Sequence, residues 1–273
     1  MREWRDPDLK DFAAVQHHAL PDVSDARRVI ALDAIHNLRD VGGYPTVDGR
    51  TTRWRRLFRS DSLHRAKGAD MPIVKDLGLR TLIDLRTTDE IELAGRFPEE
   101  LHPLDHHHIS IIDSTWHSAG VTVDPETTAA DFLEWAYNDM LDHGGARFVD
   151  AYHVLAGADS LPALYHCAVG KDRTGLLSML ILGSLGVPAP FIAADYGLTD
   201  QGMQRMIAWA ERNSPETFAR YQGIPSAFLA AAPEAILRVI ATIDAEHGSL
   251  RNYVRHLGVA DDAVDRLAAQ LLE

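Results

Sequence analysis

A cysteine and an arginine, separated by five residues, are the side chains whose types and spacing best fit a chemical role. Cys167 is the only cysteine among 273 residues, and Arg173 follows it within residues 166–175, which read HCAVGKDRTG. A thiolate is a strong nucleophile, and a guanidinium can hold two oxygens of a phosphate at once. Together they supply what transfer of a phosphoryl group through a cysteine requires.

The neighbouring sequence predicts where these two side chains lie. Residues 162–166 form a short apolar run typical of a buried strand, and residues 174–185 are apolar helix formers that end at Gly186. The segment between them is therefore expected to be a turn from a strand into a helix N-terminus, where backbone N–H groups and the helix dipole attract an anion. The same position favours the thiolate form of a cysteine. The other expected members of a phosphate-binding loop are Ala168, Val169, Gly170, Lys171, Thr174 and Gly175.

A lone cysteine is more often a small buried hydrophobic side chain, and this alternative has to be weighed. A structural cysteine has no need of the glycines and charged residues that surround Cys167. A bound anion satisfies such a polar cluster most simply. The neighbours therefore favour a functional role for Cys167.

Residues 166–175 resemble the phosphate-binding loop of protein tyrosine phosphatases. The GKDRTG ending is similar to that of a bacterial subgroup, the atypical tyrosine and lipid phosphatases related to mycobacterial protein tyrosine phosphatase B. The resemblance runs from Asp33 onward, thins over 113–150, and is carried by residues 37–44, 57–60, 83–86 with Glu90, and 248–258. It implies a tyrosine-phosphatase-like fold, no metal or organic cofactor, and a phosphorylated protein or phosphoinositide as substrate.

Together with the chemistry of the residues, the resemblance implies a role for each part of the loop. Cys167 would attack phosphorus and form a cysteinyl-phosphate, while Arg173 and the loop amides hold the phosphate oxygens. Thr174 would donate to the thiolate and assist its departure. Asp172 is expected to be the general acid that protonates the leaving oxygen, ahead of the alternative that it only orients Lys171 or Arg173.

Three assignments stay open in the sequence: the general acid, the role of Lys171 and the substrate. Asp113 follows an apolar run over 109–112, as the acid does in better-known tyrosine phosphatases, but it lacks their Trp-Pro context and ranks behind Asp172. Lys171 is either a cation at the rim of the loop, which in relatives accompanies phosphoinositide substrates, or a solvated lysine. Phosphotyrosine, phosphoserine or phosphothreonine, and phosphoinositide all remain candidate substrates, because pocket depth depends on loops that the sequence does not place.

Other polar residues are expected to support the loop. His166 resembles the family histidine that orders the loop through a hydrogen bond, and Arg59 resembles a family residue near the site. Asp84 is expected to be a buried partner of an arginine, and residues 37–40 to fix a turn beneath the loop. Residues 106–108 are three histidines, but a polar strand end is favoured over a metal site, because strand neighbours point to opposite faces and no spaced ligand set accompanies them.

Strand and helix patterns alternate before the cysteine and give way to helices after it. The alternation predicts an α/β fold with a mainly parallel central sheet flanked by helices and a large helical C-terminal half, with the site at the carboxyl ends of the strands. Strands are expected over 29–32, 54–58 after a turn at 48–49, 80–85, 106–112 and 162–166. Helices are expected over 9–20, 71–77, 88–93, 131–140, 146–155, 174–185, 188–196, 199–212, 233–246, 249–256 and 261–272.

No linker or repeat divides the chain, so a single phosphatase domain over 1–273 is expected. Residues 188–230 include Met203, Met206, Ile207 and Ala210 at helical spacing. Core packing explains such a stripe most often, but the resemblance implies that helices after the catalytic helix form a lid, and flexible methionines suit reversible packing.

Composition limits the partners and the location of the chain. The net charge of −13 argues against nucleic acid, although a local field can still bind a phosphate substrate. The charged N-terminus has no signal-peptide core, and no apolar run approaches a membrane span, so no stable membrane insertion is expected. A cytoplasmic location is predicted, with leaderless export left open. The sequence indicates no oligomeric state.

Two rival classes could use such a loop. A phosphate-binding module without catalysis is disfavoured because Cys167, Asp172 and Arg173 are all present. A sulfurtransferase usually lacks the Arg-Thr-Gly ending. An arsenate reductase of the phosphatase type needs further cysteines, and this chain has none.

Overall fold

A five-stranded sheet forms the centre of the computed structural model, which describes residues 20–98, 102–116, 118–124 and 126–273. The strand order is β1-β2-β5-β3-β4, with β1 antiparallel to β2 and the remaining neighbours parallel. The strands are β1 (Arg39–Asp40), β2 (Leu57–Ser60), β3 (Thr81–Asp84), β4 (Asp105–His108) and β5 (Ala163–His166). The predicted α/β fold with a mainly parallel sheet is confirmed, and the strand that leads to Cys167 is its central strand.

Helices surround this sheet and make up most of the chain after Cys167, as predicted. They are α1 (Asp70–Asp76), α2 (Thr88–Ala94), α3 (Ala129–Leu155), α4 (Asp172–Ser184), α5 (Ala189–Gly197), α6 (Thr199–Asn213), α7 (Pro215–Gln222), α8 (Ser226–Leu229), α9 (Pro233–His247), α10 (Leu250–Leu257) and α11 (Asp261–Leu271), with a short 3-10 helix at Leu63–Arg65. No helix in the described ranges has the length and apolar character needed to cross a membrane.

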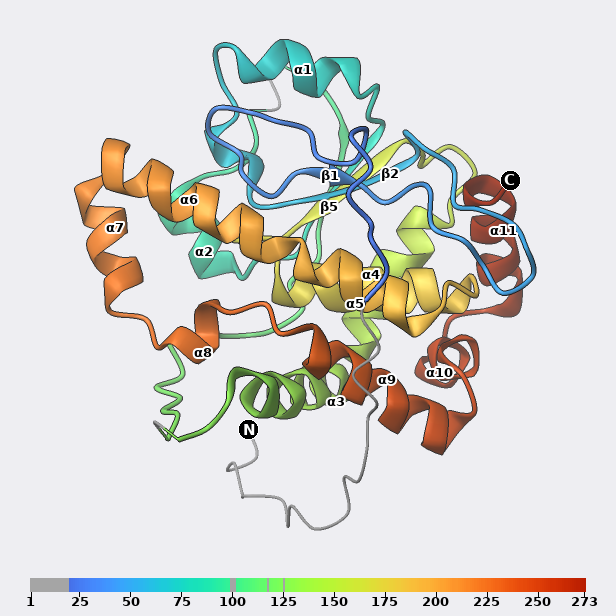
Figure 1. Ribbon diagram of the computed structural model, residues 1–273. Helices are drawn as coiled ribbons and strands as arrows, with labels where there is room; N and C mark the ends of the chain where they lie inside the picture. Colours follow the sequence, from blue (N-terminus) through green and yellow to red (C-terminus); the bar gives the residue numbers. More distant parts are fainter. Residues whose placement is uncertain (1–19, 99–101, 117, 125) are drawn as a thin grey trace.

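The two faces of the sheet enter two separate hydrophobic cores, because successive strand residues point to opposite faces. Leu82 and Leu164 belong to the smaller core with Val74 of α1, whereas Ile83 and Tyr165 belong to the larger core. Figure 1 shows α1 on one side of the sheet and α3, α4, α5 and α9 on the other. Burial on both faces explains why β3 and β5 carry adjacent apolar residues rather than an alternating pattern.

Helix α3 is continuous, although the sequence predicted two separate helices over 131–140 and 146–155. Its interior contains two glycines, which lower helix propensity. A Cβ at Gly144 would lie 2.9 Å from the carbonyl oxygen of Ile111, and one at Gly145 would lie 3.0 Å from Leu257. The glycines therefore let two neighbouring segments approach α3 closely, and this packing keeps the helix intact.

Other element predictions hold in part. The turn at 48–49 is confirmed, since the Thr46 N–H donates to the Arg50 carbonyl oxygen at 2.9 Å. Strand β4 ends at His108, four residues earlier than predicted, and the expected strand over 29–32 is reduced to a single bridge. Helices α7 and α8 were not predicted. Apart from Leu20, the helix expected over 9–20 lies outside the described residues.

Candidate active site

The loop between β5 and α4 places Cys167 at the carboxyl end of the central strand. β5 ends at His166, and α4 begins at Asp172, two residues earlier than predicted. Gly170 has a φ of +70°, and a Cβ there would lie 2.4 Å from the carbonyl oxygen of Ser60. Only glycine fits this position. The predicted strand-to-helix turn is therefore present, with Asp172 and Arg173 in the first turn of the helix.

Unpaired N–H groups line this loop. None of the backbone N–H groups of residues 168–171 donates a hydrogen bond within the part of the chain that the structure describes. The loop carbonyls are instead engaged: Asn37 Nδ2 donates to those of Val169 and Gly170, at 2.9 and 3.1 Å. Free donors next to occupied acceptors suit the binding of an anion. The role expected for residues 37–40 beneath the loop agrees with these contacts.

Cys167 is buried, with 1% of its surface exposed. Its carbonyl oxygen lies 3.0 Å from His166 Nδ1. Because a carbonyl only accepts, Nδ1 is assigned as the protonated nitrogen. Burial lowers the pKa of His166, so the ring is neutral near pH 7. This contact agrees with the expected role of His166 in ordering the loop.

Arg173 is held by a carboxylate from a different helix. Its Nη1 and Nη2 donate to the two carboxylate oxygens of Glu90 at 2.5 and 2.9 Å. Glu90 also closes the capping box of α2, where the Thr87 N–H donates to Glu90 Oε2 at 2.8 Å. Burial alone would raise the pKa of Glu90, but the hydrogen bonds from Arg173 lower it. The carboxylate is therefore ionised and fixes the guanidinium before any substrate binds.

The sequence offered only an indirect signal for this pair. Glu90 stood out only through its resemblance to a family position. Its partner Arg173 lies 83 residues further along the chain, and no local pattern indicates the contact.

Of the two candidate acids, Asp172 is the one beside the cavity in front of the loop. Its side chain lines that cavity and is 16% exposed. Its Oδ1 accepts a hydrogen bond from the Tyr137 hydroxyl at 2.7 Å. Asp113 is exposed and does not line the cavity.

Lys171 is a buried residue of the loop. Its side chain is only 1% exposed, and Nζ donates to the carbonyl oxygens of Phe228 and Ala230 at 2.6 and 2.8 Å. The alternative of a solvated lysine is wrong, and the ammonium group points to the C-terminal end of α8. A buried ammonium needs acceptors, and carbonyls at the end of a short helix lack partners, so each satisfies the other.

The remaining loop residues pack under the site. Thr174 Oγ1 is buried and makes no hydrogen bond within the described ranges, so the donation expected toward Cys167 is not made here. The Ala168 carbonyl oxygen accepts from the Ser62 N–H at 3.1 Å. A Cβ added at Gly175 would lie 2.9 Å from the Tyr196 ring.

A buried cluster of charges lies beneath the loop. Arg59 Nη2 donates to the Gly170 carbonyl oxygen at 3.0 Å, and its Nη1 binds Asp195 at 2.5 Å. Asp195 also accepts from Arg39 Nε at 3.1 Å. Burial would raise the pKa of Asp195, but the two arginines lower it. Two cations and one carboxylate leave a positive charge under the loop, which favours an anion above it.

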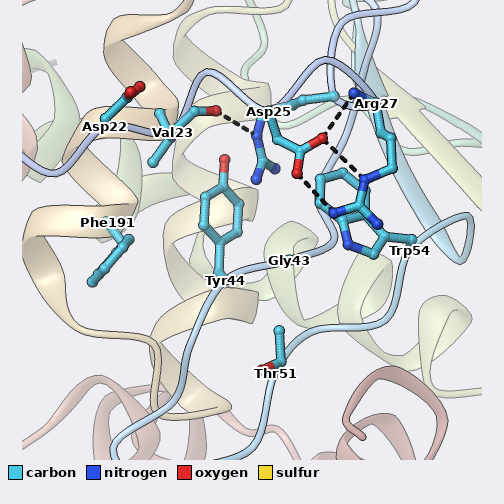
Figure 2. Close-up of a pocket in the computed structure, with 10 residues that line it drawn as sticks. Asp22, Val23, Asp25, Arg27, Gly43, Tyr44, Thr51, Trp54 and Phe191 are labelled. Carbon is cyan, nitrogen blue, oxygen red and sulfur yellow. Dashed lines mark hydrogen bonds and ion pairs between the residues drawn. The ribbon is translucent and has the colours of Figure 1, made fainter.

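Asp195 links this cluster to a second cavity. The Tyr44 hydroxyl donates to Asp195 at 2.8 Å. Figure 2 shows Tyr44 among the residues that line a cavity of about 280 Å³, with Trp54 and Arg27. Among the described residues, none lines both this cavity and the one in front of Arg173. The sequence marked Arg59 as near the site but gave no signal for Asp195, which lies in an expected helix.

The cavity in front of the loop has a volume of about 170 Å³ and a largely apolar wall. Among the described residues that line this cavity, Arg173 is the only lysine or arginine. The wall contributed by α6 to α8 and the segment between α7 and α8 consists of Met203, Tyr221, Ile224, Phe228 and Leu229. Phe228 stacks on Phe132 with ring centroids 4.8 Å apart. The expected lid segment therefore lies over the site.

Asp84 pairs with Arg86 at 2.6 Å, as predicted for a buried partner of an arginine. Two of the three histidines in residues 106–108 contact different partners: His107 contacts Asp105, and His108 contacts the Arg86 carbonyl oxygen. Within the described ranges, no group of three or more His, Cys, Asp or Glu side chains is arranged to hold a metal ion.

The sheet, the cysteine loop and the arginine in the first helical turn define a hydrolase of the protein-tyrosine-phosphatase type. The sequence matches the tyrosine phosphatase family over residues 30–273, and the chain belongs to this family. It is similar to a Cupriavidus necator protein named as a tyrosine-protein phosphatase, with 30% identity over 259 residues that cover 90% of this chain and 87% of the relative.

The chain is also similar to the triple specificity protein phosphatase PtpB of Mycobacterium tuberculosis. Identity is 27% over 279 residues, which cover 86% of this chain and 96% of PtpB. The predicted membership of the PtpB-like atypical branch is confirmed. Among solved structures, P. aeruginosa TpbA covers 74% of this chain and 99% of its own, but its TM-score of 0.33 and identity of 14% are too low to add to the argument.

Proposed function

We propose that this chain hydrolyses phosphate monoesters of phosphoproteins through a cysteinyl-phosphate intermediate, with Cys167 as the nucleophile. The observation that carries the proposal is the set of unpaired N–H groups at residues 168–171, which lie in the loop between Cys167 and Arg173. Anion-binding donors around a cysteine are what an in-line attack on phosphorus requires.

In the first step, the Cys167 thiolate attacks phosphorus, and an S–P bond forms as the P–O bond to the leaving group breaks. Loop amides and Arg173 hold the three non-bridging oxygens as charge shifts among them. Asp172 gives its proton to the leaving oxygen, so a free alcohol or phenol departs.

In the second step, water attacks the phosphorus of the cysteinyl-phosphate. Asp172, now a carboxylate, takes a proton from this water, and the S–P bond breaks to release inorganic phosphate and the thiolate. The Thr174 hydroxyl, which has no partner among the described residues, is available to donate to the departing sulfur. No step of this cycle calls for a metal or organic cofactor.

The cavity wall favours phosphotyrosine as the first substrate. Aromatic and aliphatic side chains such as Trp116 and Phe228 suit the ring of a tyrosine. A phosphoinositide carries extra phosphates that need extra cations, whereas Lys171 is engaged by two carbonyls. We therefore rank phosphoserine and phosphothreonine second and phosphoinositide last, although PtpB is named for triple specificity.

Helices α6 to α8 contribute one wall of the cavity of about 170 Å³ in front of the loop. Cys167, in the same loop, is buried. We propose that residues 188–230 act as a lid within a single domain. Hydrogen exchange across 188–230 with and without vanadate tests it, because equal protection in both states would contradict a lid.

The function is tested by phosphate release from matched phosphotyrosine and phosphoserine peptides and a phosphoinositide panel, with Cys167→Ser beside the wild type. We expect turnover of phosphotyrosine that vanadate blocks and that the variant lacks. Phosphate binding without turnover of any substrate would instead indicate a phosphate-recognition module. Release of sulfite from thiosulfate without phosphate release would indicate a sulfurtransferase.

A further inference from the structure

We infer that Tyr137 and Tyr196 are positioning residues that hold the Asp172 carboxyl group for proton transfer. The inference rests on the proposed function, in which Asp172 is the general acid. The two tyrosines form a hydrogen-bonded relay that ends on Asp172. No pattern in the sequence indicates this role for either residue.

The relay joins three helices at one point. The Tyr137 hydroxyl, from α3, donates to Asp172 Oδ1, at the start of α4, at 2.7 Å. The hydroxyl oxygens of Tyr137 and Tyr196, the latter from α5, lie 2.5 Å apart. Because Tyr137 has only one hydroxyl proton and gives it to Asp172, Tyr196 must be the donor in the second hydrogen bond. The relay therefore runs from Tyr196 through Tyr137 to Asp172.

Both phenols keep their protons near pH 7. Tyr137 and Tyr196 are 0% and 1% exposed. Burial, and then the negative charge of Asp172, raise the pKa of each phenol well above its ordinary value. The relay is thus a pair of permanent donors, and it does not compete with Asp172 for the transferable proton.

The relay leaves one carboxyl oxygen free. Lys171 Nζ lies 3.4 Å from Oδ1, so the lysine and Tyr137 both approach the same oxygen of Asp172. No hydrogen bond reaches Oδ2 from any residue that the structure describes, and Asp172 lines the cavity in front of the loop. With Oδ1 occupied by donors, the acidic proton resides on Oδ2, which is the oxygen available to a leaving group.

Packing holds the relay against the loop helix. The Tyr196 ring lies so close to Gly175 that a Cβ there would come within 2.9 Å of it. The rings of Tyr137 and Tyr196 meet edge to face, with centroids 6.1 Å apart and planes at 82°. An aspartate in the first turn of a helix can otherwise rotate about its side-chain bonds. Two rigid rings anchored on α3 and α5 restrict that rotation, and orientation is a large part of acid catalysis.

The test uses Tyr137→Phe with two substrates that differ in their need for an acid. Phosphotyrosine peptide has a poor leaving group, whereas 2,4-dinitrophenyl phosphate releases a phenolate that needs little protonation. We expect kcat to fall about tenfold on the peptide, a part of the 10²–10⁴-fold that a general acid supplies. On dinitrophenyl phosphate we expect a change within about twofold, with KM unchanged for both, because the phosphate cradle is intact.

Tyr152→Phe is the matched control. Tyr152 also lies on α3, is buried, and bonds through its hydroxyl to Ser184 of α4 at 2.8 Å. This variant removes the same group between the same two helices without touching Asp172. We expect it to leave both kcat values unchanged.

Asp172→Asn completes the set. It should lose activity on the peptide far more than on dinitrophenyl phosphate, and adding Tyr137→Phe to it should cause no further loss, because the relay acts only through Asp172. Tyr196→Phe provides a second variant should Tyr137→Phe fold poorly. It should show a smaller loss, about threefold, with the same dependence on the leaving group, since Tyr137 keeps its own bond to Asp172.

Several outcomes would overturn the relay. These are an equal loss on both substrates, no loss on the peptide, or a loss that adds to that of Asp172→Asn. An equal loss on both substrates in Tyr152→Phe and Tyr137→Phe would assign the effect to helix packing. If the wild type turned over neither substrate, the proposed function would fail and the relay with it. If the wild type turned over both and Tyr137→Phe showed no selective loss, only the relay would fail.

Discussion

The ion pair between Glu90 and Arg173 should control both the stability of the protein and the position of the Arg173 guanidinium, which is proposed to bind the phosphate. The change Glu90→Gln keeps the size of the side chain but removes its charge. One amide oxygen can still accept a hydrogen bond, so the bidentate contact at 2.5 and 2.9 Å is lost while Arg173 stays buried. A buried guanidinium without its counter-charge is costly.

The burial of the two side chains sets the size of the effect. Breaking a fully buried pair costs about 3–5 kcal/mol. Because the Arg173 and Glu90 side chains are 8% and 19% exposed, we expect a loss of about 2–3 kcal/mol. For a chain of this size, that corresponds to a melting temperature lower by roughly 5–10 °C. A misplaced clamp should also lower kcat by about 100-fold.

Thermal melts at pH 7 with and without vanadate, together with phosphotyrosine turnover, measure these effects. Vanadate should raise the melting temperature of Glu90→Gln more than that of the wild type, because the anion replaces the missing negative charge. Glu134→Gln is the matched control. Glu134 contacts Arg238 at 3.2 Å, and the two side chains are 20% and 33% exposed. Arg238 keeps its contact with Asp131 in this variant, so we expect a change below about 1 kcal/mol.

The charge of Glu90 provides a second readout. Its pKa is lowered in the folded state, so the stabilisation is complete above the ordinary glutamate pKa of about 4.3 and is lost as pH falls through the lowered value. The wild type should lose more stability over that fall than Glu90→Gln. If the variant melted within 1 °C of the wild type, about the resolution of a 0.3 kcal/mol effect, and kept full activity, the pair would not be what holds Arg173.

Two further changes test the loop, and one tests His36, a buried residue next to Asn37. Burial lowers the pKa of His36 to about 4. Between pH 6.5 and 4 the unfolded chain takes up a proton that the folded chain does not, so stability should decline over this range by at most about 3 kcal/mol. His36→Asn should flatten this part of a plot of melting temperature against pH. Gly170→Ala would place a Cβ 2.4 Å from the Ser60 carbonyl oxygen, so we expect at least about 2 kcal/mol of destabilisation. Vanadate should also no longer inhibit any remaining activity of this variant. An unchanged melting temperature would contradict the close approach. Lys171→Met should lower hydrogen-exchange protection over 226–231, and equal protection would show that its two carbonyl contacts do not hold that segment.

Local sequence was enough to predict the strand–loop–helix arrangement around Cys167. The strand over 162–166, the cysteine, the arginine six positions later and the following helix are consecutive, and their spacing alone brings them together. The sheet followed from the alternation of strand and helix patterns. The predicted elements differ from the structure mainly where packing overrides propensity, as at Gly144 and Gly145 inside α3.

Tertiary structure decided which groups hold the side chains that we propose as catalytic. Glu90 is 83 residues from Arg173, Tyr137 is 35 residues from Asp172, and Asp195 is 136 residues from Arg59. Such partners are chosen by how helices pack on the sheet, and no local pattern records that choice. The sequence by itself determined which residues can react. Only the packed fold decided which side chains orient them, because those contacts join segments far apart in the chain.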